Sequence, residues 1–248
     1  MRNIVLGICY DGTNYAGFQR QKNLPTIQGE IEDKLMSVLK EDVRIKGASR
    51  TDAGVHAKGQ VVNFLTGSSI PVQRFPYILN DRLPRDIRVI WAKEGKPGFH
   101  ARFSAISRTY KYIVYNKNII SPFVARYALI YPESLDLYLM REAGEKLVGE
   151  HDFSPFSPEK GKTIRRLQLL DIRRKKNIII FTLEANAFLK GMVRSIIGYL
   201  LQIGSQKLPK SVMNEIFNGK YDFKSILAEP QGLYLWKVKY DSSLFKEE

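Results

Sequence analysis

The sequence predicts a mixed α+β fold built from two tandem ferredoxin-like halves, each with its elements in the order β-α-β-β-α-β. Two observations support this. Along the chain, the spacing of apolar residues switches between the period of a strand and the period of a helix. The same order of elements then occurs twice within 248 residues, without a repeat of the residues themselves. We expect an N-terminal half at 1–104 and a C-terminal half at 105–248, with joined antiparallel sheets, helices on one face and a cleft between the halves.

The first half begins with an alternating segment at 3–10, which is typical of a strand with one buried face. Thr26 is a suitable N-cap for a helix, because Ile27, Ile31 and Leu35 follow it at helical spacing. The other elements expected here are strands at 43–48 and 60–65, a helix at 71–82 and a strand at 86–92.

The second half repeats this order and ends in an alternating, aromatic-rich strand. Its expected elements are a strand at 107–116, a helix at 134–148, strands at 166–174 and 177–185, helices at 188–203 and 210–218, and a strand at 233–240. The segment 152–163 is rich in Pro, Ser and Gly and is expected to be a loop.

The charge balance is strongly basic, with 39 Lys and Arg against 25 Asp and Glu and a net charge of +14. Such a surplus favours a polyanionic partner such as a nucleic acid, although a solvated basic surface remains an alternative. The basic residues are spread along the chain and are densest between Arg165 and Lys176. This spread disfavours a membrane-surface helix.

Several features place the chain among cytoplasmic proteins. No apolar run approaches the ~20 residues that span a bilayer. The N-terminus lacks the pattern of a signal peptide. Cys9 is the single cysteine, so the chain has no internal disulfide.

The segment 47–60 is the most unusual part of the sequence. Small residues and glycines surround Arg50, Asp52 and His56. Glycines permit tight turns and a close approach of the backbone to a ligand. Taken alone, Asp52 also fits an Asx-turn, in which the carboxylate bonds nearby backbone amides. The residues by themselves leave both a functional and a structural interpretation open.

The run RTDAGVHA at 50–57 resembles the signature of the TruA family of tRNA pseudouridine synthases. Further matching motifs follow in order over nearly the whole chain. They are YDGT at 10–13, GFQRQ at 17–21, FHAR at 99–102, RTYKY at 108–112, GEHDF at 149–153, NAFL at 186–189, MVR at 192–194 and GLYL at 232–235. The chain departs from the family pattern at Ser49, at Lys190-Gly191 and at Glu229-Pro230.

The resemblance implies an isomerase that converts uridine to pseudouridine in the anticodon stem-loop of tRNA. The N1–C1′ bond breaks, the base rotates and a C5–C1′ bond forms, so the reaction is redox-neutral. By resemblance the enzyme is a homodimer that needs neither a metal nor an organic cofactor. His56, His100 and His151 lie in unlike contexts and do not suggest a metal site.

The resemblance assigns Asp52 as the catalytic nucleophile and Arg194 as the cation that keeps it ionised. Tyr110 would stack on the target base. Without the family, Tyr110 also fits core packing in an alternating strand. Arg194 falls at the edge of the apolar face of its helix, so a side chain that extends to solvent is the alternative there.

The remaining assignments concern the substrate. Arg50 would occupy the space that a flipped base vacates, and Leu233 would line the uracil pocket. Contacts to RNA phosphates are expected from Arg20, Gln21 and Arg102.

Two other function classes compete with the synthase. A non-catalytic RNA-binding protein is the main alternative, but the aromatic signature of RNA-recognition modules is absent from the sequence. A metal-dependent nuclease or phosphotransferase would need several carboxylates around Mg²⁺. The nearest acids before Asp52 are Glu41 and Asp42, the nearest after it is Asp81, and they lack a suggestive spacing.

Overall fold

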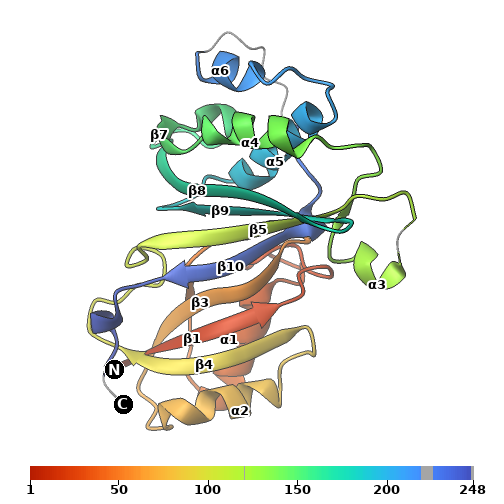
Figure 1. Ribbon diagram of the computed structural model, residues 1–248. Helices are drawn as coiled ribbons and strands as arrows, with labels where there is room; N and C mark the ends of the chain where they lie inside the picture. The colour runs from red at the N-terminus through yellow and green to blue at the C-terminus, as the bar shows by residue number, and fades with distance from the viewer. Residues whose placement is uncertain (120, 219–225, 247–248) are drawn as a thin grey trace. The chain divides into compact units, whose positions relative to one another are not determined.

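A computed structural model describes residues 1–119, 121–218 and 226–246 of the chain. It divides into two compact units. The first comprises Met1–Ser107 together with Tyr234–Glu248, and the second comprises Arg108–Leu233. Both combine a sheet with helices, which confirms the mixed α+β class (Figure 1).

The first unit contains the strand and helix order predicted for the N-terminal half. Its elements are β1 (Arg2–Tyr10), α1 (Ile27–Leu39), β2 (Lys46–Gly47), β3 (His56–Thr66), α2 (Phe75–Asn80), β4 (Ile87–Gly95) and, from Tyr234 on, β10 (Leu233–Lys239). Its sheet has the order β4-β1-β3, with β2 also paired to β3, and these pairs are antiparallel. This is the strand arrangement of a ferredoxin-like unit.

Helix α1 forms where the apolar spacing predicts it. The Thr26 side chain accepts a hydrogen bond from the Gly29 N–H, and Lys40 ends the helix in a left-handed conformation. Ile27, Ile31 and Leu35 are buried against the sheet core, and α1 runs behind β1 and β3 in the view of Figure 1. The burial of this apolar stripe therefore fixes one covered face of the sheet.

The second unit is built on a four-stranded antiparallel sheet with the order β5-β9-β8-β7. Helices α4 and α5 pack on each other, and both lie above β8 and β9 in Figure 1. The elements are β5 (Ser107–Tyr115), α3 (Pro122–Ala125), β6 (Leu129–Ile130), α4 (Leu137–Glu145), β7 (Gly149–Asp152), β8 (Ile164–Lys175), β9 (Ile178–Ala185), α5 (Met192–Gly204) and α6 (Val212–Phe217). Helix α5 is buried along almost its whole length, as its apolar sequence predicts.

Several boundaries differ from the prediction for identifiable reasons. The strand expected at 43–48 shrinks to β2, because the Ile45 N–H bonds the Glu32 carboxylate at 3.0 Å instead of a neighbouring strand. Helix α5 begins at Met192 rather than at 188, since Gly191 before it is left-handed, with φ of 72°. The short elements α3, β6 and β7 carry too few residues to show a period.

The last strand also differs in its partner. The sequence assigns 233–240 to the C-terminal half, whereas β10 pairs in parallel with β3 of the first unit, with Tyr234 opposite His56. Gly59 permits this approach, because a Cβ there would lie 2.6 Å from the Trp236 carbonyl oxygen. Within the described ranges, no helix is long and apolar enough to cross a lipid bilayer.

Candidate active site

The loop that carries Asp52 connects β2 to β3 in the first unit. It leaves the sheet at Ala48, whose N–H donates to the Val61 carbonyl at 2.8 Å. It returns in a tight turn in which the Val55 N–H donates to the Asp52 carbonyl at 3.2 Å. Gly54 lies in this turn with φ of 75°, a conformation that favours glycine. Asp52 is half-buried in the turn.

Tyr10, the last residue of β1, and the segment between β1 and α1 together contact this loop, and we call them the cradle. The Tyr10 hydroxyl lies 2.7 Å from the Thr51 hydroxyl, and both side chains are buried. The Phe18 N–H donates to the Thr51 carbonyl at 3.0 Å, and the Gly54 N–H donates to the Tyr15 carbonyl at 3.4 Å. The loop is therefore attached to the cradle on both sides of Asp52.

Two glycines of the cradle allow the backbones to approach this closely. A Cβ on Gly12 would lie 2.0 Å from the Val55 carbonyl oxygen, far inside contact distance. Gly17 has φ of +102°, and a Cβ there would lie 2.9 Å from the Thr51 carbonyl oxygen. A larger residue at either position would push the cradle away from the Asp52 loop.

Gln60 holds the loop from the sheet side. Its amide is fully buried and bonds both backbone groups of Ser49: Nε2 donates to the Ser49 carbonyl at 2.7 Å, and Oε1 accepts from the Ser49 N–H at 3.3 Å. Nε2 also lies 3.5 Å from the Tyr10 hydroxyl. Ser49 and Thr51 are thus both fixed, and the exposed Arg50 projects between them.

His56 joins the cradle to the start of β3. Its ring is 1% exposed and stacks on Tyr234 at a centroid distance of 4.8 Å. Nδ1 accepts from the Gly12 N–H at 3.1 Å and lies 3.1 Å from the Asp11 carboxylate. His56 is therefore a buried histidine that ties the cradle to the sheet.

The second unit holds the other principal residues predicted from the sequence. Tyr110 on β5 is 5% exposed and meets Phe188 edge-on, with ring centroids 5.1 Å apart. Arg194 on α5 is half-buried, and its Nε donates to the Ala228 carbonyl at 2.7 Å. Leu233, at the start of β10, is 5% exposed.

The segment that receives Arg194 is itself fixed within this unit. The Ala228 N–H donates to the Arg194 carbonyl at 3.0 Å, which closes a reciprocal pair between the two residues. One position further on, the Glu229 carbonyl accepts from the Tyr112 hydroxyl at 2.7 Å. Burial of Tyr112 raises its pKa, so that this hydroxyl stays a donor. These bonds set the direction of the Arg194 guanidinium.

The comparison with protein families decides the relationship of the chain. The family model described as tRNA pseudouridine synthase matches residues 8–104 and 143–241. This chain belongs to the tRNA pseudouridine synthase family.

Individual relatives extend the match to nearly the full chain. The chain is 42% identical over 244 residues to the tRNA pseudouridine synthase A of Thermoanaerobacter sp. (strain X514), covering 97% of this chain and 100% of that protein. It is 42% identical to the tRNA pseudouridine synthase A of Histophilus somni (strain 2336), covering 96% of this chain and 90% of that protein. It is 40% identical to that of Bacillus pumilus (strain SAFR-032), covering 95% and 98%.

Among solved structures, similarity extends to an H/ACA RNP bound to a substrate RNA that contains 2′-deoxyuridine. The TM-score is 0.37 and the identity 9%, with 80% of this chain and 44% of that chain covered. Values this low support no inference about the chain.

In this family member, the residues expected to contact phosphates have varied surroundings. Arg20 donates to Asp33 at 2.9 Å and to Glu32 at 3.2 Å, and these two carboxylates raise its pKa. A phosphate at Arg20 would compete with them. The Gln21 amide donates to the Ala16 carbonyl at 2.8 Å. Arg102 is exposed.

The structure also shows residues that hold the Asp52 loop and to which the sequence assigned no individual role, namely Tyr10, Gly12, Gly17 and Gln60. The described part of the chain has no group of three or more His, Cys, Asp or Glu that could hold a metal ion. One signal for Gln60 was present, because it is a polar residue that opens an apolar strand segment, QVVNFL. The roles of the glycines depend on contacts between segments that are distant in sequence.

Proposed function

We propose that this chain converts uridine to pseudouridine in tRNA, with Asp52 as the nucleophile. The observation that carries the proposal is the anchoring of the Asp52 loop. Thr51 and Gly54, on either side of Asp52, bond the cradle, and Ser49 is held by Gln60. Such anchoring limits the positions that a carboxylate can take and so favours its attack on a bound substrate.

A carboxylate nucleophile suits this reaction because it needs no cofactor. Asp52 forms a covalent bond to the substrate, which divides the exchange of the N1–C1′ bond for a C5–C1′ bond into separate steps. C5 of the uracil loses its hydrogen and N1 gains a proton, so that atoms and electrons balance. The nucleophile has to be ionised, and a site that excludes water opposes ionisation.

We assign the compensating charge to Arg194. Its Nε is occupied by the Ala228 carbonyl, which fixes the direction of the guanidinium plane. A guanidinium that is half-buried on an apolar helix favours an anionic partner, and the family resemblance identifies that partner as Asp52.

The substrate contacts follow from the same resemblance. Tyr110 stacks on the target uracil, and Leu233 lines the pocket around it. Arg50 fills the space that the flipped base leaves, which offsets part of the few kcal/mol that unstacking costs. Its exposed side chain between two fixed neighbours supports this role.

The RNA is the anticodon arm of tRNA, modified on its 3′ side. The relatives bear the name tRNA pseudouridine synthase A, and the net charge of +14 suits a polyanionic substrate. We further propose that the enzyme acts in the cytoplasm as a homodimer, in which one subunit grips the tRNA while the other modifies it.

Pseudouridine analysis tests the function directly. An unmodified tRNA transcript is incubated with the purified protein, digested to nucleosides and separated by chromatography. We expect pseudouridine to appear, and primer extension after carbodiimide treatment should place it in the anticodon arm. If transcripts are bound but no pseudouridine forms in any of them, the chain is a non-catalytic RNA-binding protein.

A further inference from the structure

A second group of ring and cationic side chains lies in the first unit, on the loop that follows β4. Phe103 is 77% exposed, an unusual position for an aromatic side chain. The His100 ring lies 4.5 Å from the Phe103 ring at an angle of 39°. The Arg102 guanidinium lies 5.8 Å from the same ring centroid. We call His100, Arg102 and Phe103 the ring platform.

The loop beneath the ring platform is anchored by side chains from distant parts of the unit. The Ala101 N–H donates to Asn63 at 2.9 Å, and the Tyr240 hydroxyl donates to the Ala101 carbonyl at 2.6 Å. Asn3 donates to the Phe99 carbonyl at 2.9 Å. Phe99 and Ala101 are buried. The exposed Phe103 side chain is therefore carried by an anchored loop.

The ring platform lies over the face of this sheet that α1 and α2 leave uncovered. Side chains alternate between the two faces of a strand. Phe64 on β3 meets Phe75 of α2 at 5.8 Å, so its neighbour Asn63 points to the opposite face. Asn63 is the residue that bonds the platform loop. Of the two faces of this sheet, the platform therefore takes the one without helices.

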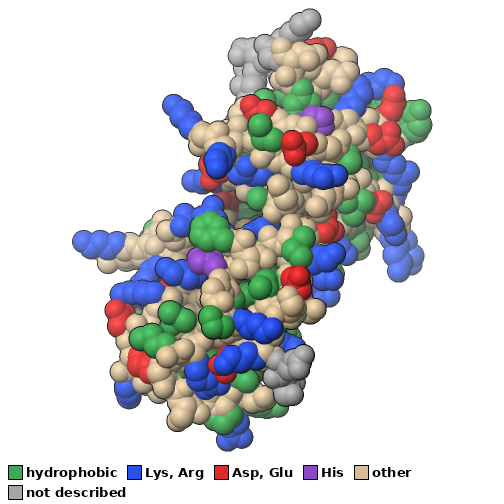
Figure 2. Space-filling model, turned by 90° about the vertical axis from the view of Figure 1, so that its left-hand side faces the viewer, with side chains coloured by type: hydrophobic (Ala, Val, Ile, Leu, Met, Phe, Trp, Pro, Cys, Tyr) green, Lys and Arg blue, Asp and Glu red, His purple; other side chains and the backbone are tan. Residues whose placement is uncertain are grey.

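The surroundings of the ring platform are basic. Burial lowers the pKa of His100, and the charges of Lys46 and Arg102 lower it further, which favours the neutral form of the ring. The ring platform thus combines aromatic rings with the nearby positive charges of Lys46 and Arg102. Figure 2 shows Lys and Arg side chains distributed over the face that it draws.

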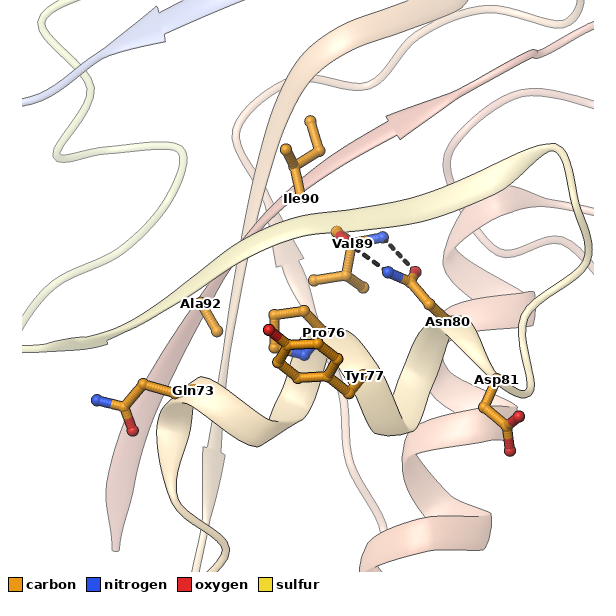
Figure 3. Close-up of a pocket in the computed structure, with 8 residues that line it drawn as sticks. All are labelled: Gln73, Pro76, Tyr77, Asn80, Asp81, Val89, Ile90 and Ala92. Carbon is orange, nitrogen blue, oxygen red and sulfur yellow. Dashed lines mark hydrogen bonds between the residues drawn. The ribbon is translucent and has the colours of Figure 1, made fainter.

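Another exposed aromatic residue in the same unit provides a contrast. Tyr77 on α2 is 75% exposed and lines a shallow pocket between α2 and β4. The pocket is lined by Gln73, Pro76, Tyr77, Asn80, Asp81, Val89, Ile90 and Ala92 (Figure 3). These residues include an acid and neither Lys nor Arg. Tyr77 and Phe103 are similarly exposed. Of the two, Phe103 is the one with a cationic side chain beside it that would attract a phosphate.

We infer that the ring platform binds a second nucleotide of the RNA, outside the pocket of the target uridine. The base stacks on Phe103, and the phosphates beside it meet Arg102 and Lys46. That the RNA is tRNA rests on the proposed function. The base has to be unpaired or terminal, because a duplex covers the faces of its bases.

The position along the chain suits this role. Lys46 precedes Arg50 by four residues, and four residues of extended chain span at most about 14 Å. Successive nucleotides of one strand are ~3.4 Å apart along a helix axis. A strand that reaches Arg50 can therefore also reach Lys46 and the ring platform within a few nucleotides.

Filter binding of a tRNA transcript at fixed salt tests the inference with Phe103→Ala. Stacking contributes ~1–3 kcal/mol per base, so Kd should rise about 5- to 150-fold. KM should rise with it, and kcat at saturating tRNA should stay unchanged. Phe103→Trp, which keeps a stacking surface, should restore the affinity, and the control Tyr77→Ala should bind as the wild type does.

Three results would overturn the inference. They are an unchanged Kd for Phe103→Ala, equal losses for Phe103→Ala and Tyr77→Ala, and a Phe103→Ala variant that sediments at a different oligomeric state, which would make this face a contact with a second copy. Thermal melting of each variant verifies that it is folded. Because Kd is measured without reaction, a wild type that binds tRNA but forms no pseudouridine would refute the proposed function and leave this test intact.

Discussion

The hydroxyl of Tyr10, at the end of β1, lies 2.7 Å from the hydroxyl of Thr51, the residue before Asp52. Both side chains are buried, at 4% and 7% exposure. The first strand of the fold is thereby bonded directly to the loop of the proposed nucleophile. Since Gln60 approaches the same Tyr10 hydroxyl, the sheet, the cradle and the loop form one hydrogen-bonded unit.

Tyr10→Phe removes this hydroxyl and keeps the ring. The Thr51 hydroxyl then loses its partner in a buried site, which costs about 1–3 kcal/mol of unfolding free energy. We expect kcat to fall as the loop loosens, while KM for tRNA changes little, because Tyr10 is too buried to touch RNA. Urea unfolding and steady-state kinetics measure the two effects. Tyr77→Phe removes an exposed hydroxyl and should alter neither, and a Tyr10→Phe enzyme with normal kcat would show that the bond does not position Asp52.

Gln60→Glu tests the bonds to Ser49 with almost no change in shape. The carboxylate still accepts from the Ser49 N–H, but it has no N–H to donate to the Ser49 carbonyl. Displacement of a catalytic group by ~1 Å can lower the rate about 100-fold, so we expect kcat to fall by about 10- to 100-fold. Gln73→Glu, on an exposed residue, is the matched control for the change of charge. Equal kcat values for Gln60→Glu and wild type would contradict the role of Gln60.

Gly12→Ala tests the close approach of the cradle to the Asp52 loop. The new methyl carbon would lie 2.0 Å from the Val55 carbonyl oxygen, so one backbone has to move. Such overpacking costs about 1–3 kcal/mol, and we expect a lower melting temperature together with lost activity. In Gly67→Ala the nearest atom is the end of the Glu41 side chain at 3.5 Å, and melting should be nearly unchanged. Similar melting of the two variants would contradict the tight packing at Gly12.

The titration of His100 reports the environment of the ring platform. Burial, then Lys46 and Arg102, lower its pKa below the ordinary value of ~6.5. Because the pKa of His100 is lower in the folded chain than in the unfolded chain, its contribution to the free energy of unfolding is complete above the unfolded pKa. This contribution is lost as the pH falls through the folded pKa. NMR titration should therefore give a low pKa, and Arg102→Gln should raise it. Added tRNA should also raise it, by bringing phosphates close, and a pKa that tRNA leaves unchanged would argue against RNA at this site.

The sequence predicted the α+β class and most elements because their apolar periods are long and regular. The stripe of Ile27, Ile31 and Leu35 is an example, and all three residues are buried. The shortening of β2 could not be predicted, since it depends on the Glu32 carboxylate, which reaches across from α1 to the Ile45 N–H. The parallel pairing of β10 with β3 likewise joins residues nearly 180 positions apart.

The candidate site shows the same division. The motif RTDAGVHA pointed to Asp52, and small residues around one acid indicated a loop that approaches a ligand. The contribution of Tyr10 depends on hydrogen bonds to Thr51, about 40 residues away, and to Gln60, about 50 residues away. No local sequence pattern encodes contacts between segments this far apart. The exposed position of Phe103 could not be predicted either, because the exposure of an aromatic side chain depends on the folded chain.

The most direct test of Asp52 as the nucleophile is tritium release from tRNA labelled at C5 of uridine. Wild type is compared with Asp52→Asn and with Asp81→Asn, a control carboxylate that is 78% exposed in its side chain. We predict release by wild type and Asp81→Asn, and none above background by an Asp52→Asn protein that is folded and binds tRNA normally. Release by Asp52→Asn at the wild-type rate would contradict the account, because the isomerisation would then proceed without this carboxylate.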